Sequence, residues 1–154
     1  MFGGKITTYR RLAEAAMARL APCLGRRAGN WTSAAALPGG DLPRQDFAAF
    51  HADCARRWPW LPAPTLLRAC RAYGTRLESI LGGARRLADL GIHFGAGLTE
   101  AEVAHLVDRE WALSEDDVLW RRTKLGLHLS PAERAAFVVR PRPQPASPSV
   151  MNTR

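Results

Sequence analysis

The stretch Thr99–Trp111, TEAEVAHLVDREW, carries two independent signals for one amphipathic helix. Thr99-x-x-Glu102 has the form of a capping box, in which the two side chains satisfy free backbone N–H groups at the helix start. Apolar residues then recur on one helical face, and we expect them to form the core stripe: Val103, Leu106, Val107 and Trp111. The stretch predicts a helix that ends near Trp111 and packs through that stripe.

Two further helix starts follow on the C-terminal side. Ser114-x-x-Asp117 should open a helix that carries Val118, Leu119 and Trp120 and ends near Gly126. Ser130-Pro131-Ala132-Glu133 combines a cap, a proline at the first helical position and a capping-box glutamate, and this last helix should fade by Val139. Residues 140–154 are Pro-rich and polar, which predicts a disordered tail.

Helical periodicity also dominates the N-terminal side. The first helix should span residues 9–20 with Thr8 as its cap, and a loop of about 20 residues should follow it. We expect helices over residues 45–57 and 64–73, then a short helix opened by Thr75-x-x-Glu78 and a turn over 84–90. Strand patterns are almost absent. The predicted fold is therefore all-α, a compact bundle of six or seven short helices.

Composition fits a soluble globular domain, with 47% apolar and 23% charged residues. No window approaches 18 uninterrupted apolar residues, and no charged segment followed by an apolar run marks a secretory signal. The three cysteines are odd in number and form no CxxC pair, which favours reduced, cytosolic thiols. The four histidines show neither HxxxH nor HExxH spacing, so we expect no metal site.

The net charge of +8 is concentrated in residues 1–98, where 14 Lys/Arg face 6 Asp/Glu. Residues 99–154 hold 8 of each sign, and 20 of the 22 basic residues are arginine. Arginine pairs at 10–11, 26–27, 56–57 and 85–86 fall on different predicted elements without interleaved aromatic residues. We favour a solvated or partner-facing basic surface, and keep a helical nucleic-acid-binding module as the alternative.

The sequence contains neither a GxxxxGK[ST] phosphate loop nor a strand-borne GxGxxG, and no Ser/His/Asp or Cys/His constellation stands out. Two segments still attract attention. Gly3–Arg10, GGKITTYR, leads two glycines, a lysine and two threonines into a helix start, where a positive dipole end suits a negative group. Asp116–Gly126, DDVLWRRTKLG, is acidic at its start and basic at its end, which is better explained by helix stabilisation through Asp117 and Arg121 or Arg122.

Taken together, five segments resemble bacterial FAD-dependent (aerobic) glycerol-3-phosphate dehydrogenases: GGKITTYRRLAE at 3–14, LPGGD at 37–41, LRACRAYG at 67–74, DLG at 89–91 and EVAHLVDREWALSEDDVLWRRTKLGL at 102–127. They follow one another in the order that the family has. The resemblance implies an enzyme that oxidises sn-glycerol 3-phosphate to dihydroxyacetone phosphate. It implies that a hydride passes to FAD, and electrons then pass to quinone at the cytoplasmic face of the inner membrane.

The resemblance also implies a division of the chain. Residues 1–20 correspond to the last loop and helix of a flavin domain, 21–44 to a connecting loop, 45–139 to the helical C-terminal domain and 140–154 to the tail. Residues that would line the flavin are Gly3, Gly4, Lys5, Ile6, Thr7 and Thr8. Lys5 would also stand near the substrate phosphate. The family offers no catalytic residue to transfer onto the helical domain, for which packing, dimerisation or partner contact is the expected role.

The family's dinucleotide fold and substrate sheet have no counterpart in these 154 residues. We therefore expect the chain alone to bind no FAD and to be inactive, with the flavin and substrate domains as its partners, a homodimer possible and no nucleic acid bound. A glycerol-phosphate oxidase, which passes electrons to oxygen, remains an alternative for the full-length enzyme. A protein-interaction module remains an alternative for this chain.

Overall fold

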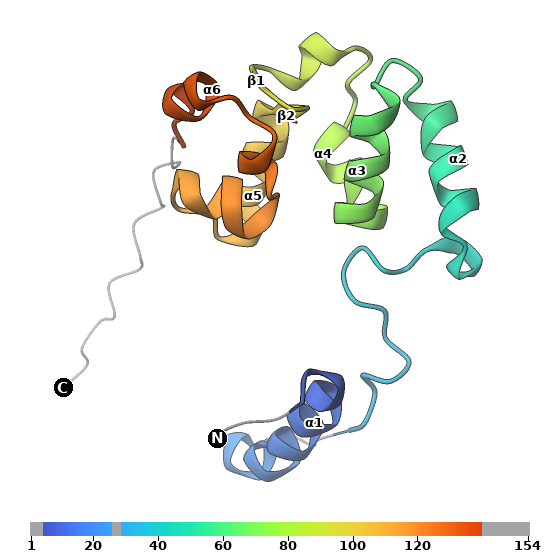
Figure 1. Cartoon of the computed structure of the whole chain (residues 1–154). Helices are drawn as coiled ribbons and strands as arrows, with labels where there is room; N and C mark the ends of the chain where they lie inside the picture. The colour runs from blue at the N-terminus through green and yellow to red at the C-terminus, as the bar shows by residue number, and fades with distance from the viewer. Residues whose placement is uncertain (1–4, 26–28, 140–154) are drawn as a thin grey trace, which may run out of the picture. The chain divides into compact units, whose positions relative to one another are not determined.

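A computed structural model describes residues 5–25 and 29–139, and the chain divides into two compact units, Met1–Asp41 and Leu42–Arg154 (Figure 1). The described part is mostly helical, with six α-helices, which confirms the predicted fold class. None of these helices is long and apolar enough to span a membrane. The expected disorder of residues 140–154 lies outside the described residues.

The first unit is built around α1 (Tyr9–Leu20), whose bounds are those that the sequence predicts. A 3₁₀ turn, Ile6–Thr8, leads into the helix, and a second one, Ala21–Leu24, closes at Gly25 in the left-handed region (φ 63°). Ala21 is the only buried residue among the described residues of this unit. The first unit therefore has no hydrophobic core of its own.

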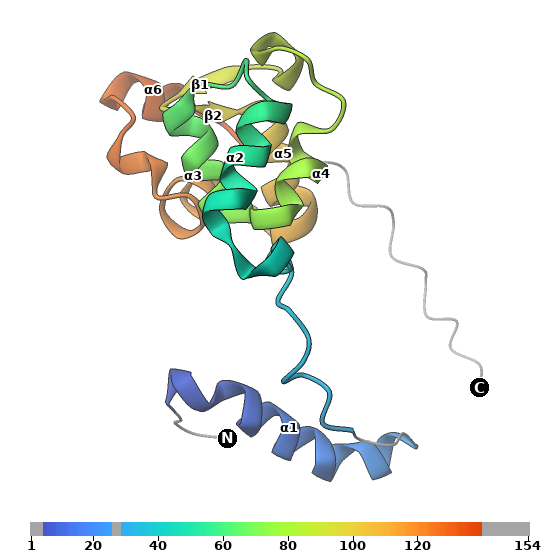
Figure 2. The same ribbon diagram turned by 90° about the vertical axis from the view of Figure 1, so that its right-hand side faces the viewer.

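The second unit holds the core and the remaining elements, which Figure 2 shows from a second side. In chain order these are α2 (Phe47–Arg57), α3 (Ala63–Tyr73), α4 (Leu77–Leu81), β1 (His93–Gly95), β2 (Leu98–Thr99), α5 (Glu100–Glu110), a π-helical segment (Asp117–Arg122) and α6 (Pro131–Ala136). Successive helices pack against one another from α2 through α5. The most deeply buried large side chains come from four of these elements: Leu77, Leu98, Leu106 and Val118.

The predicted capping box of α6 is confirmed, since Ser130 and Glu133 form it in full. Helix α2 begins two residues later than predicted, where Asp46 caps it by accepting from the Ala49 N–H at 3.0 Å. The box expected at Thr75-x-x-Glu78 is wrong, because a 3₁₀ turn places Arg76 directly before α4. Glu78 instead pairs with Arg57 across 2.7 Å.

A small antiparallel hairpin, β1–β2, was not expected from the sequence. His93 pairs with Thr99 and Gly95 with Leu98, while Ala96 and Gly97 both adopt positive φ values of 49° and 77°. Positive φ at both loop residues is the geometry that two-residue hairpin turns need. Strands of three and two residues are too short to show a period-2 pattern, which explains why the hairpin escaped prediction.

Trp111 is not part of the α5 core stripe, contrary to expectation. The helix ends at Glu110, and Trp111 turns into the left-handed region (φ 58°) with 83% of its surface exposed. Because the chain reverses at this point, Ala112 takes the inward position and is fully buried. The stripe is confirmed at Val103 and Leu106, which are 8% and 1% exposed.

The helix expected from Ser114 to about Gly126 is shorter and of another kind. It is a π-helical segment, Asp117–Arg122, followed by Lys124 in the left-handed region and a 3₁₀ turn at Leu125–Leu127. Gly126 has room only for hydrogen on its α-carbon, since an added Cβ would lie 2.7 Å from the Trp120 ring. The Thr123 hydroxyl donates to the carbonyl of Val118 at 2.7 Å and ends the segment.

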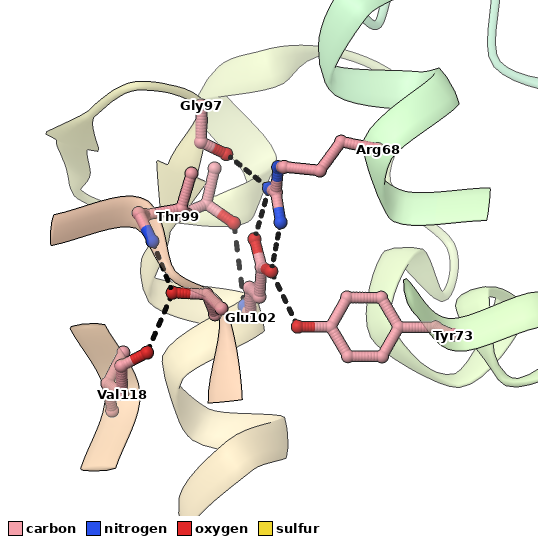
Figure 3. A network of polar contacts seen from close by, with 8 residues as sticks. Arg68, Tyr73, Gly97, Thr99, Glu102 and Val118 are labelled. Carbon is pink, nitrogen blue, oxygen red and sulfur yellow. Dashed lines mark hydrogen bonds and ion pairs between the residues drawn. The ribbon is translucent and has the colours of Figure 1, made fainter. Parts of the chain in front are cut away.

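A buried polar network, consisting of Arg68, Tyr73, Gly97, Thr99 and Glu102, joins α3, the hairpin and α5 (Figure 3). The two Glu102 carboxylate oxygens each accept from the Arg68 guanidinium at 2.7 Å, and Tyr73 Oη donates to the same carboxylate at 2.6 Å. Arg68 also donates to the Gly97 carbonyl at 3.1 Å, and the Thr99 hydroxyl caps α5 at Glu102 N.

Glu102 therefore does not close the predicted capping box with its side chain. It is only 4% exposed, and a carboxylate so buried needs a cation and hydrogen-bond donors to offset its lost hydration. Burial, reinforced by the charge of Glu102, raises the pKa of Tyr73, so the phenol keeps the proton that it donates. The network fixes three elements relative to one another at a single carboxylate.

We expect Glu102→Ala to lower the free energy of unfolding by about 3–5 kcal/mol, because it leaves the Arg68 charge inside the domain without its partner. Urea denaturation followed by circular dichroism measures the loss. Glu78→Ala is the matched control, since it removes an ion pair whose side chains are 45% and 64% exposed, and should cost far less. Equal losses for the two variants would show that the buried network does not hold the domain together.

His105 on α5 should make the domain sensitive to mild acid. Burial, together with the positive charge of Arg76, lowers the pKa of His105 below its ordinary value of 6.5, and its Nε2 has no hydrogen-bond partner among the described residues. The unfolded chain binds the proton first, so stability should fall as the pH drops below about 6.5. His105→Gln should flatten this part of a stability curve measured between pH 7.5 and 5.5, and an unchanged slope would contradict the assignment.

Candidate functional site

The segment that the sequence singles out, Lys5–Thr8, forms one compact turn ahead of α1. The Thr8 N–H and the Thr8 hydroxyl both donate to the Lys5 carbonyl, each at 2.9 Å, and thereby fix the position of Lys5 relative to the helix. All four residues are exposed, and Ile6 reaches 87%. The structure thus brings together Lys5, Ile6, Thr7 and Thr8, while Gly3 and Gly4 lie outside the described residues.

Thr8 stands at the cap position of α1 but does not act as its side-chain cap. Its hydroxyl bonds backward to Lys5 instead of accepting from an N–H of the first helical turn. A 3₁₀ turn runs directly into α1, so the Thr8 and Tyr9 N–H groups already donate to the Lys5 and Ile6 carbonyls. The exposed ammonium of Lys5 stands ahead of this turn, near the positive end of the α1 dipole, and suits a negatively charged group.

One face of α1 is apolar and uncovered. No residue of the helix is buried, and large apolar side chains follow one another at helical spacing: Ile6, Tyr9, Leu12, Met17 and Leu20, all between 39% and 87% exposed. An apolar surface of this kind usually marks a contact with another protein surface. The turn at Lys5–Thr8 sits at one end of this face.

The polar face of α1 holds the loop that follows it. The Thr32 hydroxyl donates to Glu14 at 2.6 Å, and Arg10 donates to the same carboxylate at 3.1 Å and to Thr32 at 3.5 Å. The hydrogen bond from Thr32, with the charge of Arg10, lowers the pKa of Glu14. This three-residue cluster, Arg10–Glu14–Thr32, fixes the start of the loop against the helix that carries the candidate site.

The second segment noted in the sequence, Asp116–Gly126, serves local structure. Asp117 accepts from the Leu113 N–H at 3.0 Å, from the Ser114 N–H and hydroxyl, and from Arg121 at 2.8 Å. These donors, the Leu113 amide above all, lower the pKa of Asp117 to about 2. The predicted helix-stabilising pair between Asp117 and Arg121 is confirmed.

A groove of about 670 Å³ lies in the second unit, where the sequence had indicated no binding site. It runs between β1, α5 and the end of α6, and its walls are apolar with carboxylates among them. The lining residues are Ile92, His93, Phe94, Glu100, Val103, Ala104, Val107, Asp108, Glu133, Ala136, Phe137 and Val138. Only the tertiary fold brings these residues together, so spacing along the chain could not reveal them.

The described residues contain no group of three or more His, Cys, Asp or Glu side chains arranged to hold a metal ion. Cys54 and Cys70 are free thiols buried between α2 and α3, and burial raises the pKa of Cys70 to about 12. The sequence did not reveal that Arg68 and Tyr73 are the side chains that donate to the buried Glu102 carboxylate. Arg68 carried no signal in the sequence, because helical periodicity places it away from the apolar stripe of Leu66, Ala69, Cys70 and Tyr73.

Comparison with known proteins places residues 30–139 in the family described as the C-terminal domain of alpha-glycerophosphate oxidase. The chain is 47% identical over 138 residues to D-erythritol 1-phosphate dehydrogenase of Brucella abortus (strain 2308), covering 90% of this chain and 28% of that protein. It is 46% identical to glycerol-3-phosphate dehydrogenase of Pseudomonas aeruginosa over 87% of this chain and 26% of that protein.

Aerobic glycerol-3-phosphate dehydrogenase of Escherichia coli (strain K12) is 44% identical, with 84% of this chain and 26% of that protein covered. The chain thus spans about a quarter of the length of the curated relatives that it matches. Thr32 lies within the family match and Glu14 before it, so the Arg10–Glu14–Thr32 cluster bridges the boundary of the matched region.

We expect Thr32→Val to release the loop from α1, because it removes the hydroxyl that donates to Glu14. Amide hydrogen exchange should speed up several-fold at residues 29–34 and remain unchanged in α5. Ser33→Ala is the matched control, since it deletes a hydroxyl from the exposed neighbour. If both variants exchange like the wild type, the cluster does not hold the loop.

Proposed function

We infer the function of this chain from its family, since it belongs to the alpha-glycerophosphate oxidase C-terminal domain family. The observation that carries the inference is the family match over residues 30–139 together with 44–47% identity to three dehydrogenases of phosphorylated polyols. The chain provides the helical C-terminal domain of such an enzyme, preceded by a short segment of its cofactor site.

We propose that the whole protein oxidises a short polyol phosphate, with sn-glycerol 3-phosphate as the substrate and dihydroxyacetone phosphate as the product. FAD would take up the hydride, and quinone would accept the electrons at the cytoplasmic face of the membrane. The similarity to D-erythritol 1-phosphate dehydrogenase supports a second substrate of the same class, a four-carbon polyol phosphate. The close identities of 47%, 46% and 44% do not favour one polyol over the other.

The residues proposed to face FAD and substrate are Gly3, Gly4, Lys5, Ile6, Thr7 and Thr8. The geometry of the described four fits this role, because the exposed ammonium of Lys5 is held by a tight turn at one end of an apolar face. They would hold the negative charge of a reduced flavin or of a substrate phosphate. One exposed turn forms only an edge of a flavin site, so the rest must come from the flavin and substrate domains.

The second unit has a packed core of its own. We propose packing against the flavin domain, dimerisation or partner contact as its role, and no catalytic residue within it. The apolar face of α1 supports the flavin domain as a partner, because the described residues of the first unit do not bury it. The dehydrogenase relatives weigh against a nucleic-acid-binding module, which would otherwise account for the net charge of +8.

The purified chain, mixed with FAD, should show no bound yellow chromophore and no dye reduction with glycerol 3-phosphate. A chimera in which this chain replaces the matching region of the Brucella abortus relative should bind FAD and oxidise polyol phosphates. In that chimera, Lys5→Met should lower kcat/KM by about 10²–10³-fold, the range for loss of one charge-stabilising group. Steady-state assays with glycerol 3-phosphate, erythritol 1-phosphate and glycerol measure the effect and separate the substrates.

Lys124→Met is the matched control, since Lys124 is an exposed lysine of the second unit that donates to the Trp120 carbonyl. It should leave kcat/KM within about twofold of the chimera, as is usual for surface substitutions. A chimera that folds but oxidises neither polyol phosphate would overturn the proposed function. Equal losses for the two lysine variants would overturn the role of Lys5 alone.

A further inference from the structure

The groove in the second unit has a chemistry that the proposed function does not use. Its floor includes Phe94 and Phe137, whose rings meet edge to face with centroids 5.0 Å apart, and the apolar side chain of Val107. Three carboxylates stand along it: Glu100, Asp108 and Glu133. Aromatic rings and carboxylates together form a surface that suits an apolar segment carrying positive charge.

The negative charge of the groove stands out against a chain whose net charge is +8. Glu133 accepts from the Ser130 N–H at 2.8 Å, which lowers the pKa of Glu133 and keeps it ionised. Glu100 accepts from the Ile92 N–H at 3.0 Å. Hydrogen bonds from neutral amides leave the charge of a carboxylate in place, so the groove attracts a cationic partner.

Residues 140–154, RPRPQPASPSVMNTR, form a segment of the same chain that carries both positive charge and apolar prolines. They hold three arginines, four prolines and no acidic side chain. Pro-rich sequences favour the extended polyproline II conformation, and grooves lined by aromatic residues bind such segments at low entropic cost. Arginines within the segment give it the charge that is complementary to the groove.

The segment also starts in the right place. Val138 lines the groove and is 59% exposed, and it is followed by Val139, whose N–H donates to Glu115 at 3.0 Å. The segment therefore begins two residues after a residue that lines the groove. At about 3.1 Å per residue a polyproline II chain reaches along the groove within its first few residues.

We propose that residues 140–154 dock into the groove between β1, α5 and α6 of the same chain, with arginines against its carboxylates and prolines against Phe94 and Val138. Arg140 and Arg142 lie nearest to the groove along the chain and carry most of the charge pairing. The segment then covers an apolar surface of the helical domain by itself, independently of the flavin domain.

The test uses the complete 154-residue chain and a dye-labelled peptide of residues 140–154, with binding followed by fluorescence anisotropy. In the wild type the tethered segment competes with the peptide, so binding should be weak. Arg140→Glu with Arg142→Glu should release the groove and tighten peptide binding by about tenfold, the advantage that a short tether gives to its own segment. Adding Asp108→Lys to that variant should abolish binding, and raising the salt concentration should weaken it.

Arg71→Glu with Arg85→Glu is the matched control, because it makes the same charge change at exposed residues that do not line the groove. It should bind the peptide as weakly as the wild type does. Equal binding by the wild type and by the Arg140→Glu, Arg142→Glu variant, or no binding by either, overturns the proposal. A wild-type dimer in sedimentation that the tail variant loses also overturns it, since the segment would then sit in a second copy.

Discussion

The bidentate contact between Arg68 and Glu102 is the interaction on which the helical domain depends. A buried charge is tolerated only when a partner and hydrogen bonds replace its lost hydration, so the three elements that supply these groups must meet at one point. Arg68 comes from α3, the accepting Gly97 carbonyl from the hairpin and Glu102 from α5. Tyr73 adds a second donor from α3, one helical turn further along. The apolar core fills the space around this point.

The sequence predicted the local features of the fold well, because caps and periodicity act within a few residues. The bounds of α1 and the Ser130–Glu133 box both rest on such spacing. The failures have a different origin. Glu102 satisfies the pattern of a capping box, yet its side chain pairs with Arg68, 34 residues away. Trp111 satisfies the helical period, yet its own backbone is left-handed and its side chain points outward. Neither departure can be read from the few residues around Glu102 or Trp111.

The candidate site could be predicted only in part, for the same reason. Lys5–Thr8 lie within four residues, so the turn that gathers them follows from the sequence alone. Thr32, which completes the polar cluster with Glu14, stands 18 residues further on and carried no signal as a partner of α1. The groove is the extreme case, since its walls come from the hairpin, α5 and the end of α6.

The Arg68–Glu102 contact also closes a loop of chain, since its partners are 34 residues apart. Within that loop, Gly82 and Gly83 form an exposed turn, and a Cβ added at either glycine would meet nothing within 4 Å. Loop-closure entropy grows only logarithmically, so even doubling the enclosed length costs about 0.6 kcal/mol. The turn at Gly82 is thus where this domain can take up extra residues during evolution, because an insertion there leaves the contact between Arg68 and Glu102 in place.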